Sequence, residues 1–217
     1  MRHPRRPLTL GEEIANSIAH GIGAALGIAG LVAIVVAARH RPDWQIAACA
    51  TYGTSLVLLY VCSTIYHALT NNRAKRVFKI LDHSTIYLLI AGTYTPVTLI
   101  ALRGPWGWTL FGVVWGLCVC GVVCKSLWID RLKGASTVVY LLMGWCAVVA
   151  VRPLLEALSW TGFVWLLAGG LCYTAGVVFY VNSSRFAHFV WHLFVIAGSA
   201  CQYWAVFRYV VCAPGIH

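Results

Sequence analysis

The chain has 217 residues, of which 60% are hydrophobic and 10% are charged. Soluble domains carry about 25% charged residues, so this composition excludes an ordinary soluble enzyme or binding domain. The formal net charge of +10 would suit a nucleic-acid partner. However, the basic residues lie between apolar segments instead of along one face, and we expect no nucleic-acid binding. Long apolar stretches recur along the whole chain and predict one polytopic membrane domain over residues 1–217.

Seven apolar windows follow one another, each long enough to cross about 30 Å of hydrocarbon as a helix. Barrel strands would be only about 10 residues long and would alternate in polarity. The lengths therefore predict an all-α membrane protein, a seven-transmembrane helix bundle. The windows cover residues 17–38, 44–68, 77–101, 107–128, 134–151, 159–181 and 187–209. Pro96 is expected to kink the third helix, because proline removes a backbone donor and crowds the preceding turn.

The distribution of Lys and Arg between these windows predicts the orientation of the bundle. Most of the 16 basic residues fall in the N-terminal segment and in the second, fourth and sixth loops. These are Arg2, Arg5, Arg6, Arg73, Lys75, Arg76, Lys79, Lys125, Arg131, Lys133 and Arg185, whereas Arg39, Arg41, Arg103, Arg152 and Arg208 lie on the other side. Cytoplasmic loops are enriched in Lys and Arg, so we expect a cytoplasmic N-terminus and an external C-terminus in the inner (cell) membrane.

Rare polar side chains gather at the cytoplasmic ends of the predicted helices. The second window ends in "VCSTIYHALTNNR", which places Ser63 and His67 one turn apart, and Asp82 lies near the start of the third. The seventh begins with His188 and His192, whose i, i+4 spacing puts both imidazoles on one helix face. At 1.5 Å per residue, all five side chains should lie about 5–10 Å below the cytoplasmic boundary.

The start of the first helix carries further polar groups at the same level. Glu13, Asn16 and His20 share one helix face, and His83 follows Asp82 in the third helix. Ionisable groups at membrane depth are costly and usually serve a function or pair with another group. We expect these four residues to support metal ligands or to line a cavity beside them.

Three histidines and a carboxylate at one depth could together bind a metal ion. Imidazole and oxygen ligands suit Zn²⁺, which takes three protein ligands in catalytic sites. The H-x-x-x-H spacing allows one helix to supply two of them. The sequence therefore predicts zinc on His67, His188 and His192. A plainer interpretation remains open, in which the histidines are interhelical hydrogen-bonding groups and Ser63 is a packing residue.

Four segments carry a family resemblance: "GEEIANSIAHGIGAALG", "STIYHAL", "LDHSTIYLLIAGTYTP" and "HFVWHLF". They resemble the haemolysin III family of bacterial membrane proteins, the prokaryotic branch of the progestin and adipoQ receptor superfamily, which includes the adiponectin receptors. The resemblance covers nearly the whole chain and implies seven helices with a cytoplasmic N-terminus. It also implies zinc on the three histidines, an aspartate matching Asp82 that acts through the zinc-bound water, and a serine matching Ser63 beside it.

The favoured functional hypothesis is a zinc-dependent hydrolase that cleaves an amide or ester bond of a membrane lipid. Zinc would polarise the scissile carbonyl and lower the pKa of water. Asp82 would act as general base, and Ser63 would orient the water or donate to the developing oxyanion. A site 5–10 Å below the interface matches the depth of a lipid's acyl linkage, so the expected partner is a membrane lipid.

Two alternatives from other classes remain. Zinc could be structural in a membrane homeostasis or receptor-like signalling protein, where it would join the second, third and seventh helices. An ion or proton conductor, or a haemolysin-like activity, ranks third, because the helices are mostly apolar outward of Tyr94 and Thr95.

Overall fold

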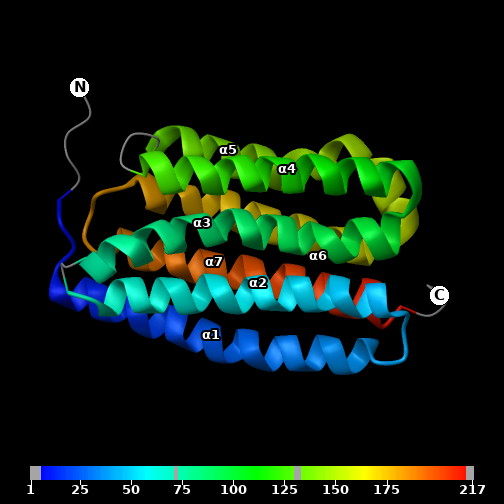
Figure 1. Ribbon diagram of the computed structural model, residues 1–217, viewed down its shortest axis with the longest axis horizontal. Helices are drawn as coiled ribbons and strands as arrows, with labels where there is room; N and C mark the ends of the chain where they lie inside the picture. Colours follow the sequence, from blue (N-terminus) through cyan, green and yellow to red (C-terminus); the bar gives the residue numbers. More distant parts are fainter. Residues whose placement is uncertain (1–5, 71–72, 130–132, 214–217) are drawn as a thin grey trace.

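The computed structural model describes residues 6–70, 73–129 and 133–213, and the regular secondary structure within these ranges is helical. The helices lie side by side with roughly parallel long axes (Figure 1). The α-helices are α1 (Leu10–Ala38), α2 (Asp43–Ala68), α3 (Arg73–Pro96), α4 (Gly104–Trp128), α5 (Lys133–Trp145), α6 (Val151–Val181) and α7 (Ala187–Val206). Short π-helical segments follow α3 (Val97–Leu102) and α7 (Phe207–Val211), and a 3₁₀ segment follows α5 (Cys146–Ala150).

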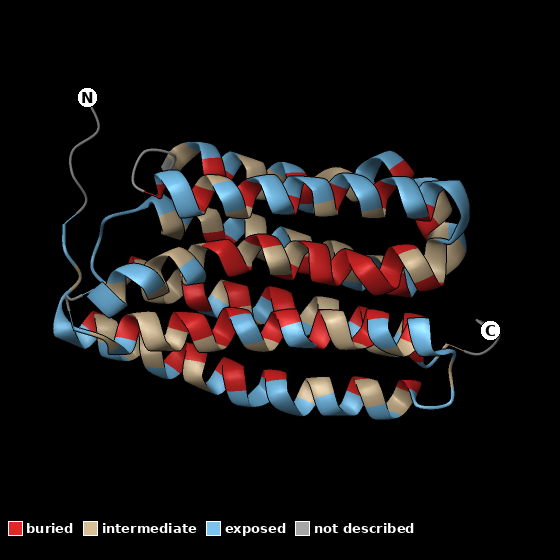
Figure 2. Ribbon diagram, viewed as in Figure 1, coloured by how far each residue is buried: buried red, intermediate tan, exposed pale blue. Residues whose placement is uncertain are grey.

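Six helical stretches of the described chain are long and apolar enough to cross a membrane. They are Leu10–Ala38, Asp43–Ala68, Arg73–Leu102, Gly104–Trp128, Gly134–Val181 and Ala187–Val211. Their outer faces expose large apolar side chains, such as Ile18 and Val119, while buried residues face the interior (Figure 2). In water this surface would be unfavourable, whereas in hydrocarbon it costs nothing. The all-α, multi-pass membrane class predicted from composition is therefore confirmed.

The first helix begins earlier than the predicted window. It starts at Leu10 instead of residue 17, because Thr9 and Glu12 form a capping box. The Thr9 hydroxyl accepts from the Glu12 backbone N–H, and the Glu12 carboxylate accepts from the Thr9 backbone N–H. A reciprocal cap of this kind satisfies two otherwise unpaired donors at a helix start. A hydropathy window misses it, since the first turn is polar.

The α-helical part of the third window, α3, ends at Pro96. The chain continues as helix, but the six residues that follow, Val97–Leu102, adopt π-helical geometry. The disturbance introduced by the proline therefore includes a widened turn, which is a common way for a helix to accommodate a missing backbone donor.

The region of the fifth and sixth windows departs most from prediction. α5 ends at Trp145, although the fifth window was predicted to run to residue 151. α6 begins at Val151, although residues 152–158 were predicted to be a loop. The interruption lies at Ser159, whose backbone is non-helical, with φ 63° and ψ 163°. Gly134–Val181 is thus one apolar stretch of 48 residues. As a straight helix it would be about 72 Å long, more than twice the hydrocarbon thickness.

The arrangement of the helices brings the polar segments together. α2 ends at the end of the bundle where α1, α3 and α7 begin (Figure 1). α1 packs along α2, α2 along α3, and α7 against α6 and α1. Gly23 of α1 allows α1 and α2 to pack closely, since a methyl group at this position would lie 2.6 Å from the Tyr60 ring of α2. Small residues commonly allow such approaches between membrane helices.

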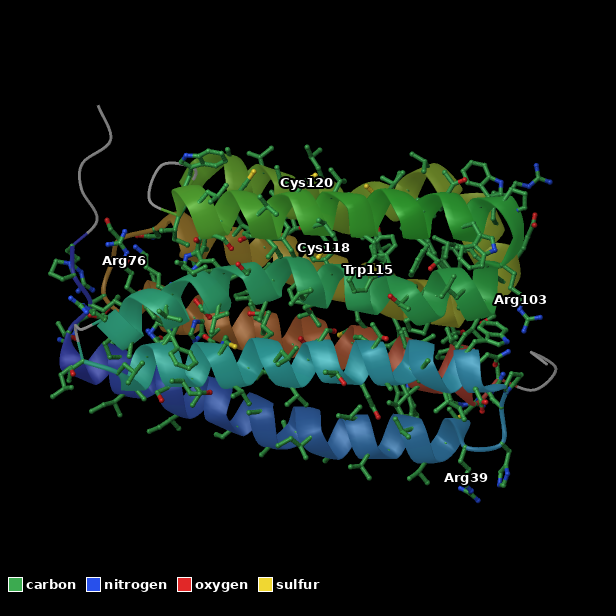
Figure 3. The ribbon with its side chains drawn as sticks, viewed as in Figure 1. Arg39, Arg76, Arg103, Trp115, Cys118 and Cys120 are labelled. Atoms are coloured by element: carbon green, nitrogen blue, oxygen red, sulfur yellow. The ribbon has the colours of Figure 1, made fainter. Side chains whose placement is uncertain are left out.

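Basic side chains mark both ends of the bundle. Arg76 lies at the end where α1 begins, and Arg39 and Arg103 lie at the opposite end (Figure 3). Trp115 and Cys118 lie between them, within the apolar length of the bundle (Figure 3). These three arginines, taken from the two sets used to predict orientation, therefore fall at opposite ends according to their set. Arg2, Arg5 and Arg131 lie outside the described residues, as does the side chain of Lys133.

Candidate metal centre

The fold brings three histidines from two helices together. His67 lies in the last turn of α2, and His188 and His192 lie at the start of α7. One ligand atom from each lies within 4.8 Å of the other two. The ring centroids are 5.3 Å apart for His67 and His188, 5.0 Å for His67 and His192, and 4.6 Å for His188 and His192. This geometry allows three imidazoles to face one ion.

The chemistry of the cluster fits a metal ion. His67 and His192 are only 3% and 2% exposed. In the described part of the chain, His67 Nε2 and His192 Nδ1 have no hydrogen-bond partner. An unpaired buried polar atom costs about 1–3 kcal/mol. A divalent cation would bind these lone pairs and remove that cost, and three nitrogen ligands are a common zinc set.

A carboxylate from α1 holds the ring of His67 from its other side. Glu13 Oε2 lies 2.5 Å from His67 Nδ1. Lys75 of α3 donates from Nζ to Glu13 Oε1 at 2.7 Å and to the Leu69 carbonyl at 2.9 Å. Asn16 is buried, and its Nδ2 lies 3.5 Å from the same His67 nitrogen. Glu13 and Asn16, both expected near the ligands, are placed against one of them.

His20 contacts the cluster differently. Its ring stacks on His192, with centroids 3.6 Å apart and planes 12° apart, and it meets the Tyr60 ring edge-on. The lone pairs of two parallel stacked rings do not converge on one point. His20 therefore holds the plane of the His192 ring in this arrangement and does not share one ion with it.

Both residues predicted to be catalytic line a cavity of about 230 Å³ that also contains the three histidines. Asp82 lies on its wall but is not among the atoms that cluster within 4.8 Å. Ser63 is buried, and its hydroxyl has no partner among the described residues. His83 also lines the cavity; its Nδ1 lies 2.8 Å from the Lys79 carbonyl and 3.5 Å from Asp82 Oδ2.

Sequence reasoning missed a second carboxylate that organises this end of the bundle. Glu12 accepts from the Arg6 guanidinium at 2.6 and 2.8 Å and from the Phe186 backbone N–H at 2.8 Å. Phe186 has left-handed backbone geometry, with φ 60°, directly before α7. Glu12 therefore fixes the start of the helix that carries His188 and His192. The sequence "TLGE" has the spacing of a capping box and could have indicated that Glu12 has a structural role.

Comparison with known proteins identifies the family of the chain. A family profile described as haemolysin-III related matches residues 8–203. Hemolysin-3 of Bacillus cereus is 46% identical over 202 residues, which cover 92% of each chain. A Hemolysin-3 homolog of Bacillus subtilis (strain 168) is 44% identical over 208 residues, or 95% of this chain and 98% of the relative. The human monocyte to macrophage differentiation factor is 28% identical over 211 residues, or 94% and 86%. The chain belongs to the haemolysin-III-related family of proteins, as its motifs predicted.

Proposed function

We propose that the protein is a zinc-dependent hydrolase that cleaves an amide or ester bond in a membrane lipid. One observation carries the proposal: three histidines able to hold a metal line the same cavity as the carboxylate of Asp82 and the hydroxyl of Ser63. When bound, zinc would polarise a scissile carbonyl and activate water. The protein would supply the proton transfers and the positioning.

Asp82 is the candidate general base. Its side chain is 16% exposed and faces the cavity, so it can reach water there while remaining largely shielded. A carboxylate in this position can take a proton from the attacking water and return it to the leaving group. Ser63, on the cavity wall, has a hydroxyl available to donate to a developing oxyanion.

The shape of the interior favours a lipid substrate. The histidine cavity shares Leu59, Ile86, Tyr180, Trp191 and Val195 with a second, mainly apolar cavity of about 110 Å³. A third cavity of about 100 Å³ shares Thr93, Tyr94, Gly144, Trp145, Gly170 and Gln202 with the second. Adjoining apolar spaces of this kind can receive an acyl chain while its linkage lies beside the histidines.

The hydrolase proposal is tested by removing and restoring the metal. Purified protein should release product from a panel of amide- and ester-linked lipids, lose this activity after treatment with a chelator, and regain it with added zinc. His40→Ala, at an exposed position after α1, should behave as wild type throughout. Equal release before and after chelation would exclude a metal-dependent hydrolase.

The proposed topology has seven crossings, a cytoplasmic N-terminus and an external C-terminus in the inner (cell) membrane. The non-helical backbone at Ser159 supports it, since a reversal there would let Gly134–Val181 cross twice. Reporter fusions after residue 75 should read cytoplasmic, and fusions after residue 156 or at the C-terminus should read external. Paired reporters that are active on opposite sides provide the control. A cytoplasmic C-terminus would contradict the seven-crossing topology.

A further inference from the structure

The contact between Glu13 and His67 determines which imidazole nitrogen can bind a metal. Glu13 Oε2 lies 2.5 Å from Nδ1 of His67. A carboxylate only accepts hydrogen bonds, so Nδ1 carries the proton in this contact, and a neutral ring then has its lone pair on Nε2. Nε2 is the His67 nitrogen that is buried without a partner.

We propose that Glu13 is a positioning residue that holds His67 in the Nδ1–H tautomer and directs Nε2 toward His188 and His192, which increases metal affinity. Metal-bound histidines commonly donate their other N–H to a carboxylate, and this fixes both the tautomer and the ring orientation. The inference rests on the proposed metal site and is independent of whether the site hydrolyses lipid.

Lys75 holds the far oxygen of the same carboxylate. Its Nζ donates to Glu13 Oε1 at 2.7 Å and to the Leu69 carbonyl, directly after α2, at 2.9 Å. The ammonium also lies 5.2 Å from the centroid of the Tyr66 ring. Rotating the Glu13 carboxylate would break charge-assisted hydrogen bonds on both sides. The chain of contacts thus runs from α3 through α1 to the histidine on α2.

Asn16 is the other polar group near Nδ1, and it does not replace Glu13. The Asn16 amide nitrogen lies 3.5 Å from Nδ1, at the limit for a hydrogen bond, whereas the carboxylate lies 2.5 Å away. An amide N–H is a donor and cannot bond to a protonated Nδ1. The shorter contact therefore sets the tautomer.

The test compares zinc affinity among Glu13 variants by competition with a chromogenic chelator. Glu13→Ala removes the acceptor and should weaken zinc binding by about 10- to 100-fold, the usual effect of losing such a partner. Glu13→Gln retains one oxygen that can accept from Nδ1–H but loses the acceptor for Lys75, so its affinity should lie between those of wild type and Glu13→Ala. Glu156 is an exposed carboxylate whose partner is Arg152, and Glu156→Ala should bind zinc as wild type does.

A second readout uses the metal-free protein. With ¹⁵N-labelled histidine, and with the His67 signals assigned by their loss in His67→Ala, wild type and Glu13→Gln should show the Nδ1–H tautomer. Glu13→Ala should show a mixture of tautomers. If Glu13→Ala does not fold, Glu13→Met fills the same volume without an acceptor and takes its place.

Wild-type zinc affinity in Glu13→Ala or Glu13→Met, or an unchanged His67 tautomer in either variant, would overturn the positioning role. Absence of zinc binding by the wild type would instead overturn the metal site. Absence of lipid hydrolysis with normal zinc binding would overturn only the proposed function.

Discussion

His192→Ala should remove most of the bound metal from the purified protein. Zinc in a catalytic site is held by about three protein ligands. His192 is a buried member of the three-histidine cluster, and its Nδ1 has no hydrogen-bond partner among the described residues. Losing one imidazole leaves only two of the three clustered ligands. The neighbouring His20 ring stacks parallel to His192, so its lone pairs are not directed at the same point. Elemental analysis should give about one zinc per chain for wild type and less than about a tenth of that for the variant.

Two other histidines provide matched controls. His40 is exposed, after the end of α1, so His40→Ala should keep its zinc. His83 lines the cavity but lies outside the three-histidine cluster, so His83→Ala should keep most of it. His3 and His217 would also serve on sequence grounds, but they lie outside the described residues. Full zinc content in a His188→Ala, His192→Ala double variant would contradict the metal site.

Asp82→Asn should retain zinc but lose about 10²–10⁴-fold in lipid turnover, the usual contribution of a general base. The amide preserves the shape of the side chain but cannot take a proton. Asp82 is not one of the clustered ligands, so metal content should not change. Product release from the lipid panel, measured beside zinc content, gives the result.

Ser63→Ala is the comparison for that variant. It should also retain zinc but lose less turnover, because it removes one hydrogen-bond donor and no proton acceptor. If zinc only joins α2, α3 and α7, as in the signalling alternative, Asp82→Asn on α3 should lower the melting temperature and leave hydrolysis unchanged. That result would favour a structural metal over a catalytic one.

The clustering of the histidines was predictable because helical periodicity is local. His188 and His192 are four residues apart, so they share a face in any helix. His67 could be assigned to the same cluster because the second predicted helix ends on the membrane side where the seventh begins. The close approach within 4.8 Å additionally requires that α2 and α7 pack near each other, which spacing along the chain does not specify.

The supporting contacts were less predictable, because they depend on segments brought together by the fold. The bond of Glu12 to Phe186 joins residues 174 positions apart, and that of Lys75 to Glu13 joins residues 62 apart. An interruption before residue 159 was predicted, because the sixth window begins there, but the helix over Val151–Leu158 was not. The positive φ of Ser159 was also not predicted, since a serine in an apolar stretch carries no signal for left-handed geometry.

X-ray absorption at the zinc edge tests the central claim most directly. If His67, His188 and His192 hold zinc, the purified protein should show imidazole nitrogens at about 2.0–2.1 Å, and this signal should disappear in His192→Ala. A spectrum dominated by sulfur at about 2.3 Å would place the metal on cysteines instead. Either that spectrum, or an imidazole signal unchanged in His192→Ala, would contradict a metal centre at the three histidines.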